Sequence, residues 1–182
     1  MNLKKHKAFT MIELVIVITV IGILASAIFL DFRHAKQRQE VALMADQTLA
    51  MMQQTQAEVR SGKVDEEGEF ICEGAFFEVG KTPNLAKGLF NRNCLDWQKL
   101  PYGFTTAGAY VKNIDVGGVD APKIWAFFIP PDGRITFYDD GGSRFIGETT
   151  IIFGHRQDEK AEVELKISHL TGQAALHNDL YE

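Results

Sequence analysis

One carboxylate stands alone in the most apolar stretch of the sequence. From Phe9 to Leu30 the chain reads FTMIELVIVITVIGILASAIFL, and Glu13 is the single charge in these 22 residues. A carboxylate inside a membrane span costs on the order of 2.5–3.5 kcal/mol, and less near the interface. If the chain is cut after Ala8, Phe9 gains a free α-amine about one helical turn from Glu13. The amine and the carboxylate can then compensate each other, within one chain or between neighbouring chains.

The apolar stretch has the length and the uniformity of a membrane span. At 1.5 Å per residue, a helix of 22 residues crosses a hydrocarbon core of about 30 Å. A core helix of a soluble protein shows polar positions on one face, whereas this run is apolar all round. Lys4, Lys5 and Lys7 precede the run. They favour a cytoplasmic N-terminus and an exported C-terminus.

Three interpretations of this segment compete. It is a secretory signal peptide cut at Ala25-Ser26-Ala27, an uncut signal anchor, or a segment cut before the apolar run, which then stays on the mature chain. Glu13 favours the third interpretation, because a simple signal peptide gains nothing from an inserted carboxylate. The other interpretation of Glu13 is a charge tolerated near the membrane edge.

The N-terminal segment KKHKAFTMIELVIVITVIGILA resembles the signature of type IV prepilins and type II secretion pseudopilins. The shared features are a basic leader, a small residue, the motif Phe-Thr-x-Ile-Glu-Leu and an apolar helix. The resemblance implies that a prepilin peptidase cuts between Ala8 and Phe9 and methylates the new amine of Phe9. It also implies that Glu13 is the carboxylate needed for assembly.

The same resemblance implies a place and a set of partners. The chain is expected to be a single-pass protein of a bacterial inner membrane, with a cytoplasmic N-terminus and a periplasmic head, and to enter a filament. The expected partners are other pilin or pseudopilin subunits, the prepilin peptidase, an inner-membrane assembly platform and the lipid bilayer.

Two positions depart from the pattern of the family. Ala8 stands where Gly is usual before the cut; Ala is the next smallest side chain and is compatible with cleavage, at a rate that the sequence leaves open. Major subunits commonly have a helix-kinking Pro where this chain has Leu30. The missing Pro favours a minor subunit over an abundant one.

The sequence predicts four segments: a leader at 1–8, a transmembrane and assembly helix at 9–30, an amphipathic continuation of the helix at 31–61, and a periplasmic β-rich head at 62–182. In the continuation, one helical face carries five apolar side chains that are expected to pack on the head. These are Val41, Ala45, Leu49, Met52 and Val59. Gly62 is a credible helix stop.

Beyond Gly62, short runs of β-branched and aromatic residues alternate with Gly, Pro and Asp, which is typical of strands and turns. The expected fold is therefore α+β and pilin-like, with a long helix packed on a small antiparallel head. The candidate strands are Glu69–Cys72, Ala75–Val79, Gly103–Thr106, Ala109–Ile114, Lys123–Ile129, Arg134–Tyr138, Thr149–His155, Ala161–Ser168 and Gln173–His177.

Residues 126–176 also resemble the C-terminal part of H-type minor pseudopilins and related minor pilins. The resemblance rests on two turns and on the hydrophobic strands around them. The turns are Pro131-Asp132-Gly133 and Leu170-Thr171-Gly172.

Cys72 and Cys94 are the two cysteines of the chain. They show no metal-binding spacing. In an exported head they are expected to form a disulfide, and two buried thiols are the alternative. The five histidines form no catalytic or zinc motif. The sequence therefore predicts no metal, no cofactor and no enzyme activity.

The charge balance disfavours nucleic acid as a partner. Three of the 19 Lys and Arg residues precede Phe9, so the rest of the chain carries 16 cations against 24 acids, a balance of −8. Affinity for nucleic acid depends largely on cations that replace condensed counterions. The sequence favours a minor pilin or pseudopilin that primes or caps a filament. The alternatives are a signal-anchored periplasmic binding module outside any filament and a competence-type minor pilin in DNA uptake.

Overall fold

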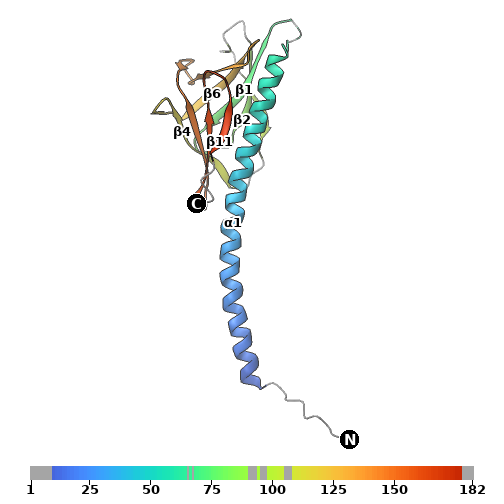
Figure 1. Cartoon of the computed structure of the whole chain (residues 1–182), viewed down its shortest axis with the longest axis vertical. Helices are drawn as coiled ribbons and strands as arrows, with labels where there is room; N and C mark the ends of the chain where they lie inside the picture. The colour runs from blue at the N-terminus through green and yellow to red at the C-terminus, as the bar shows by residue number, and fades with distance from the viewer. Residues whose placement is uncertain are drawn as a thin grey trace. The chain divides into compact units, whose positions relative to one another are not determined.

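The computed structural model describes residues 10–64, 66, 68–89, 94, 98–104 and 108–177. The chain divides into two compact units, of which the first ends at Lys36 and the second begins at Gln37. Helix α1 (Met11–Arg60) belongs to both units, and the strands lie in the second unit (Figure 1). A long N-terminal helix with antiparallel sheets confirms the predicted α+β, pilin-like fold.

Helix α1 continues over 50 residues because nothing in its sequence interrupts it. It contains no Pro and a single glycine, Gly22. After Arg60 the Ser61 amide still bonds to the Ala57 carbonyl at 3.1 Å, and the Ser61 hydroxyl donates to the Glu58 carbonyl at 2.6 Å. Gly62 then turns the chain at a φ of 78°, in the left-handed region that ends many helices.

The described strands form two antiparallel sheets in the second unit. One sheet has the order β3-β2-β1-β6-β7-β8, and the other has the order β11-β10-β9-β4-β5. The strands of the first sheet are β1 (Ile71–Glu78), β2 (Asn84–Leu89), β3 (Gln98–Gly103), β6 (Lys123–Ile129), β7 (Arg134–Tyr138) and β8 (Arg144–Phe145). Those of the second sheet are β4 (Ala109–Val116), β5 (Val119–Asp120), β9 (Thr149–His155), β10 (Asp158–Ile167) and β11 (Ala174–His177).

The predicted strands agree best with the structure in the centre of the sheets. The bounds of β6, β7 and β9 are those predicted, and β4, β10 and β11 differ by a few residues at one end or both. The two strands predicted on either side of Gly74 are one strand, β1. Residues 105–106 of the strand predicted at Gly103–Thr106 lie outside the described residues, Gly103 ends β3, and Phe104 is not in a strand. Strands β2, β5 and β8 and all of β3 before Gly103 lie outside the predicted strands. β5 and β8 have only two residues each, whereas β2 contains a Gly and β3 contains a Pro.

One face of α1 forms a wall of the core in the second unit. Val41, Ala45, Met52 and Val59 are buried as predicted, and Leu49 is half-buried. Further buried positions on this face are Met44, Thr48, Met51 and Thr55. The two hydroxyls are satisfied within the helix, since Thr48 donates to the Met44 carbonyl and Thr55 to the Met51 carbonyl. Apolar side chains of both sheets complete the same cluster, among them Phe77, Phe128, Ile151, Phe153 and Leu165.

Polar contacts hold the beginning of this helical segment to the second sheet. Glu40 Oε2 lies 3.2 Å from His155 Nε2, and the His155 side chain is only 5% exposed. The Gln157 amide donates to His155 Nδ1 at 3.1 Å, which makes Nδ1 an acceptor. The neutral ring therefore carries its proton on Nε2 and donates it to Glu40.

The last turns of α1 are held to two turns of the sheets. Gln56 Nε2 donates to the carbonyls of Gly133 at 3.0 Å and Thr171 at 3.2 Å. Arg60 Nε donates to the Asp132 carbonyl at 3.1 Å. The structure thus brings the turn before β7 and the turn before β11 to the same side chain of α1. These are the two turns that carry the resemblance to minor pseudopilins.

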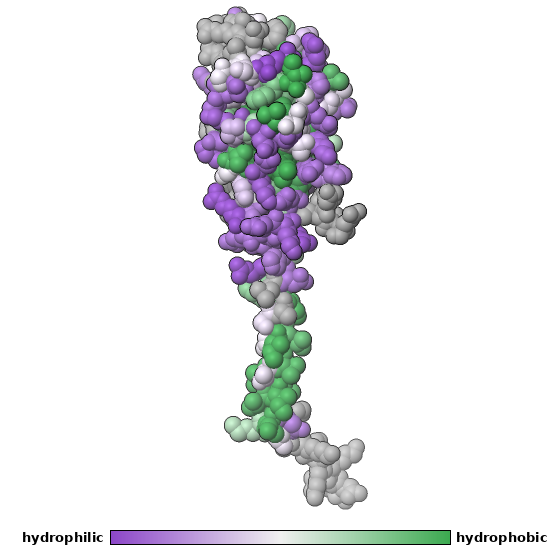
Figure 2. Space-filling model, turned by 90° about the vertical axis from the view of Figure 1, so that its left-hand side faces the viewer, coloured by the Kyte–Doolittle hydropathy of each residue, from purple (hydrophilic) through white to green (hydrophobic). Residues whose placement is uncertain are grey.

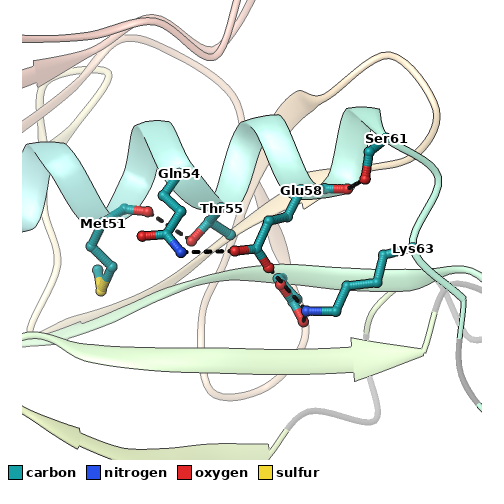
Figure 3. A network of polar contacts seen from close by, with 7 residues as sticks. Met51, Gln54, Thr55, Glu58, Ser61 and Lys63 are labelled. Atoms are coloured by element: carbon teal, nitrogen blue, oxygen red, sulfur yellow. Dashed lines mark hydrogen bonds and ion pairs between the residues drawn. The ribbon is translucent and has the colours of Figure 1, made fainter.

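Lys63 links the helix end to β1. Its Nζ lies 2.9 Å from Glu58 Oε2 and 3.0 Å from Glu73 Oε1, and Gln54 Nε2 donates to the other oxygen of Glu58 (Figure 3). The hydrogen bonds to Glu58 and to Glu73 raise the pKa of Lys63, and the bond from Lys63 lowers the pKa of Glu58. The Lys63 side chain is 45% exposed, so this network fixes geometry more than it adds stability.

Gly74 lies where the backbone of β6 leaves no room for a side chain on β1. A Cβ atom at this position would lie 1.8 Å from the Ala126 carbonyl oxygen, which is backbone and cannot move aside. The Glu73-Gly74 pair looks like a strand break in the sequence. In the structure, Gly74 lies within a continuous ladder, paired with Phe127 on one side and with Ala86 on the other.

We expect Gly74→Ala to lower the free energy of unfolding by about 3 kcal/mol, because β1 and β6 must separate to admit the methyl group. Gly154→Ala is the matched control, since the three atoms nearest to its Cβ would be side-chain atoms of Lys112, at 3.1 Å or more, and no backbone atom lies as close. The control should lose less than about 1 kcal/mol. Denaturant unfolding of the full chain in detergent measures both. Equal losses would contradict the tight approach at Gly74.

Candidate functional site

Glu13 lies in the first turn of α1, where Thr10 and Glu13 cap the helix reciprocally. Glu13 Oε2 accepts hydrogen bonds from the Thr10 amide and the Thr10 hydroxyl, both at 2.8 Å. The Glu13 amide donates to Thr10 Oγ1 at 3.3 Å, and the Leu14 amide bonds to the Thr10 carbonyl at 3.2 Å. This Thr-x-x-Glu arrangement is a capping box. Sequence reasoning missed the role of Thr10, although the spacing is visible in the sequence.

The capping box leaves part of the carboxylate available. Both bonds from Thr10 go to Oε2, and Oε1 accepts no hydrogen bond from the described residues. The Glu13 side chain is exposed. A carboxylate at a helix N-terminus is also stabilised by the helix dipole. Glu13 can therefore cap its own helix and receive a cation at Oε1 at the same time.

The apolar half of α1 is covered by nothing in the described chain. Its large apolar side chains have exposed fractions from 46% at Val17 to 86% at Met11. Figure 2 shows the described residues of this stretch as mostly hydrophobic, in contrast to the mostly hydrophilic surface of the strand-bearing unit. Its two hydroxyl groups are satisfied inside the helix, by Thr19 to the Val15 carbonyl and by Ser26 to the Ile23 carbonyl. By length and composition this is the one described helix that can cross a membrane.

Residues 3–29 match the family model of the prokaryotic N-terminal methylation motif. This motif supports a type IV prepilin-like character of the N-terminal segment. No curated protein and no solved structure matches the chain. The motif and the exposed apolar helix fit a membrane-anchored, pilin-like subunit, and the family is structural rather than catalytic.

Two of the predicted site residues, those of the proposed cleavage site, lie where the structure gives no description. Ala8 and Phe9 lie outside the described residues, so cleavage and N-methylation there stay predictions. The alternative cleavage site Ala25-Ser26-Ala27 lies within α1. Glu13 as the assembly carboxylate also stays a prediction, now with a defined geometry.

The strand-bearing unit of the prepilin-like chain contains the cysteine pair. Cys72 of β1 and Cys94, between β2 and β3, are joined by a disulfide with a Cα–Cα distance of 5.8 Å. Both are fully buried beside Phe76, Trp125 and other aromatic residues on the face of the first sheet that lies opposite the main core. Phe76 and Trp125 have ring centroids 4.3 Å apart, and Trp125 Nε1 donates to Asp140 Oδ1 at 3.2 Å.

The acidic turns of this unit use their carboxylates locally. Asp132 Oδ1 accepts from the Arg134 amide, and Asp139 Oδ1 accepts from the Ser143 amide. Asp140 pairs with Lys123. Within the described residues, no three His, Cys, Asp or Glu side chains come together in a metal-binding group.

We expect the double variant Cys72→Ala, Cys94→Ala to lose about 3 kcal/mol of unfolding free energy, because the disulfide closes a loop across 22 residues. Trp125, beside the disulfide, reports denaturant unfolding by its fluorescence. A reductant should lower the stability of the wild type to a similar extent and leave the double variant unchanged. A wild type insensitive to reductant under unfolding conditions would show that the cysteines are not paired.

Proposed function

We propose that this chain is a minor pilin or pseudopilin, a structural subunit that primes or caps a type IV pilus-like or type II secretion filament. Prepilin peptidase is proposed to remove residues 1–8 and to methylate the amine of Phe9. The observation that supports this most directly is Glu13, a single exposed carboxylate in the first turn of an exposed apolar helix. It lies within the segment that matches the methylation motif.

The proposed mechanism uses both oxygens of Glu13. In the membrane, Oε2 is held by Thr10, which offsets part of the cost of the charge. When subunits gather, Oε1 receives the Phe9 amine of a neighbour. A charge-assisted hydrogen bond in lipid or among packed helices is stronger than in water. The pair would therefore fix the axial register of each new subunit.

The apolar helix sets a second condition for the same step. A subunit anchored in the inner membrane leaves the bilayer at low cost only if neighbouring helices replace the lipid around its apolar residues. The exposed surface of α1 from Met11 to Phe32 is the surface that must be covered again. The partners are thus other pilin or pseudopilin subunits, brought together by an inner-membrane assembly platform.

The missing Pro in α1 favours a minor subunit. The position of the family's kinking Pro is Leu30 here, and α1 runs from Met11 to Arg60 without any Pro. A helix without such a kink packs differently from its neighbours in a shaft of kinked helices. An end position, where one side of the subunit has no neighbour, tolerates this difference best.

Ion pairing in the strand-bearing unit argues against the competence alternative. DNA binding needs cations that are available to phosphates. Several head cations are instead paired with carboxylates: Lys63 with Glu58 and Glu73, Lys81 with Glu78, Lys112 with Glu162, Lys123 with Asp140, Arg134 with Asp132 and Lys166 with Glu164.

Processing separates the proposal from a signal-anchored binding module. In cells with prepilin peptidase, we expect a product of 174 residues that begins at N-methyl-Phe9, because the leader is eight residues long. Intact mass and N-terminal sequencing of membrane-extracted protein measure this. The product should vanish in cells that lack the peptidase. A product that begins at Ile28 would instead identify a secreted domain, and an uncut chain would identify a signal anchor.

Substitution of Glu13 separates its charge from its cap. Glu13→Ala should reduce the chain's incorporation into sheared filaments by more than about tenfold, because the neighbouring amine is left unpaired. Glu13→Gln keeps the capping geometry but removes the charge, and it should fail equally. Both variants should still be processed and membrane-bound. Normal incorporation of Glu13→Ala would refute the mechanism, and rescue by Glu13→Gln would assign the effect to capping alone.

A further inference from the structure

Helix α1 changes from apolar to basic within a few residues at the end of its exposed apolar surface. Phe29 and Phe32 have exposed fractions of 64% and 68%, and Arg33 and Lys36 are exposed as well. Residues three or four positions apart are neighbours on a helix surface. Steps of three and four residues link all four positions. Two phenyl rings and two cations therefore share one face of α1, within the first unit.

The acid nearest in sequence to these cations lies on another side of the helix. Asp31 is two residues before Arg33, and residues at that spacing do not face each other. Arg33 makes no hydrogen bond or ion pair with the described residues, in contrast to Lys112 and Lys123 of the strand-bearing unit, which pair with carboxylates. The guanidinium of Arg33 therefore keeps its donors for an anion from outside the chain.

The two cations follow the apolar surface at the depth of lipid headgroups. A bilayer of about 40–45 Å has a hydrocarbon core of about 30 Å, which leaves about 5–7 Å of polar region on each side. At 1.5 Å per residue, Arg33 and Lys36 begin about 1.5 and 6 Å beyond Phe32. Side chains on a helix lean toward its N-terminus, here toward the membrane. The long Arg and Lys side chains can thus place their charges among phosphates while the phenyl rings stay in the apolar layer.

We propose that Arg33 and Lys36 bind the phosphate of an anionic phospholipid in the leaflet where the span ends. A guanidinium presents paired N–H donors that match two phosphate oxygens. The Lys36 ammonium adds a second positive charge from the next turn of the helix. Phe29 and Phe32, on the same face, contact the acyl chains of this lipid.

A membrane lipid is the occupant because the site continues a surface that has to lie in lipid. The large apolar side chains from Met11 to Phe32 are exposed, and hydrocarbon covers them in the membrane-anchored subunit. A lipid whose chains lie beside Phe32 carries its phosphate further along the same face, to the cations. The inference rests on the membrane anchoring in the proposed function, and it adds the class of lipid that the anchored subunit holds.

Native mass spectrometry of the full chain tests the proposal. The chain is placed in nanodiscs that contain equal amounts of phosphatidylglycerol and phosphatidylcholine with identical acyl chains, and the lipids that stay bound after release are counted. Both lipids carry a phosphate, but only phosphatidylglycerol has a net negative charge. The wild type should retain it about fivefold more often, the effect of one cation near an anionic surface, or more where both cations act together.

Two double variants locate the site. Arg33→Gln, Lys36→Gln removes both cations from α1 and should retain the two lipids about equally. Arg156→Gln, Lys160→Gln is the matched control, because it removes the same charge from two exposed positions of the strand-bearing unit. The control should keep the preference of the wild type. Circular dichroism of both variants should match that of the wild type, since all four side chains are exposed.

Equal retention of the two lipids by the wild type would overturn the lipid site, and so would a preference that the α1 variant keeps. Incorporation of the same proteins into filaments in cells separates this inference from the proposed function. A wild type that enters filaments without a lipid preference leaves the proposed function standing and removes the lipid site. An α1 variant that keeps the preference but fails to enter filaments would assign Arg33 and Lys36 to a neighbouring subunit, against the proposal. A wild type that prefers phosphatidylglycerol but never enters filaments supports the lipid site and overturns the proposed function.

Discussion

One continuous helix has to satisfy two different surroundings, and the rest of the structure depends on how it does so. Within hydrocarbon a single segment can satisfy its backbone only as a helix. The first half of α1 accordingly has apolar side chains on every face, and its hydroxyls at Thr19 and Ser26 bond to carbonyls of the preceding turn. From Gln37 the same backbone buries one face only, and Val41, Met52 and Val59 become core of the second unit. No Pro or loop separates the two roles.

Within the second unit, polar contacts hold the strands to α1 at both ends of the packed helical segment. Glu40 meets the buried His155 where the packed segment begins, and Gln56 and Arg60 bond to two turns where it ends. Contacts at one end alone would let the strands pivot about the helix, whereas contacts at both ends with a packed core between them resist both rotation and sliding.

The sequence was informative where one physical effect dominated. The apolar run, the buried face of α1 and the central strands β6, β7 and β9 each follow from a strong hydrophobic pattern. The sequence was uninformative where tertiary contacts determine the structure. Gly74, for example, looks like a strand break in the sequence, but the position must be Gly because the backbone of β6 leaves no room for a Cβ atom. Edge strands such as β3, with Pro101, gain their structure from a neighbour rather than from their own residues. In the site, Glu13 was identifiable by its isolation in the sequence, while the Thr10 bond needed the three-residue spacing to be interpreted as a cap.

The capping box also bears on how a charged residue can persist at the membrane. A carboxylate without partners would raise the cost of holding the helix in the bilayer before any neighbour arrives. Thr10 supplies two donors to Oε2 from one turn away, so the subunit brings its own first partner. In the proposed mechanism, the remaining oxygen favours assembly, because it gains a bond that the lone subunit lacks. A Thr and a Glu three residues apart thus cap the helix and leave one carboxylate oxygen, Oε1, without a hydrogen bond from the described residues.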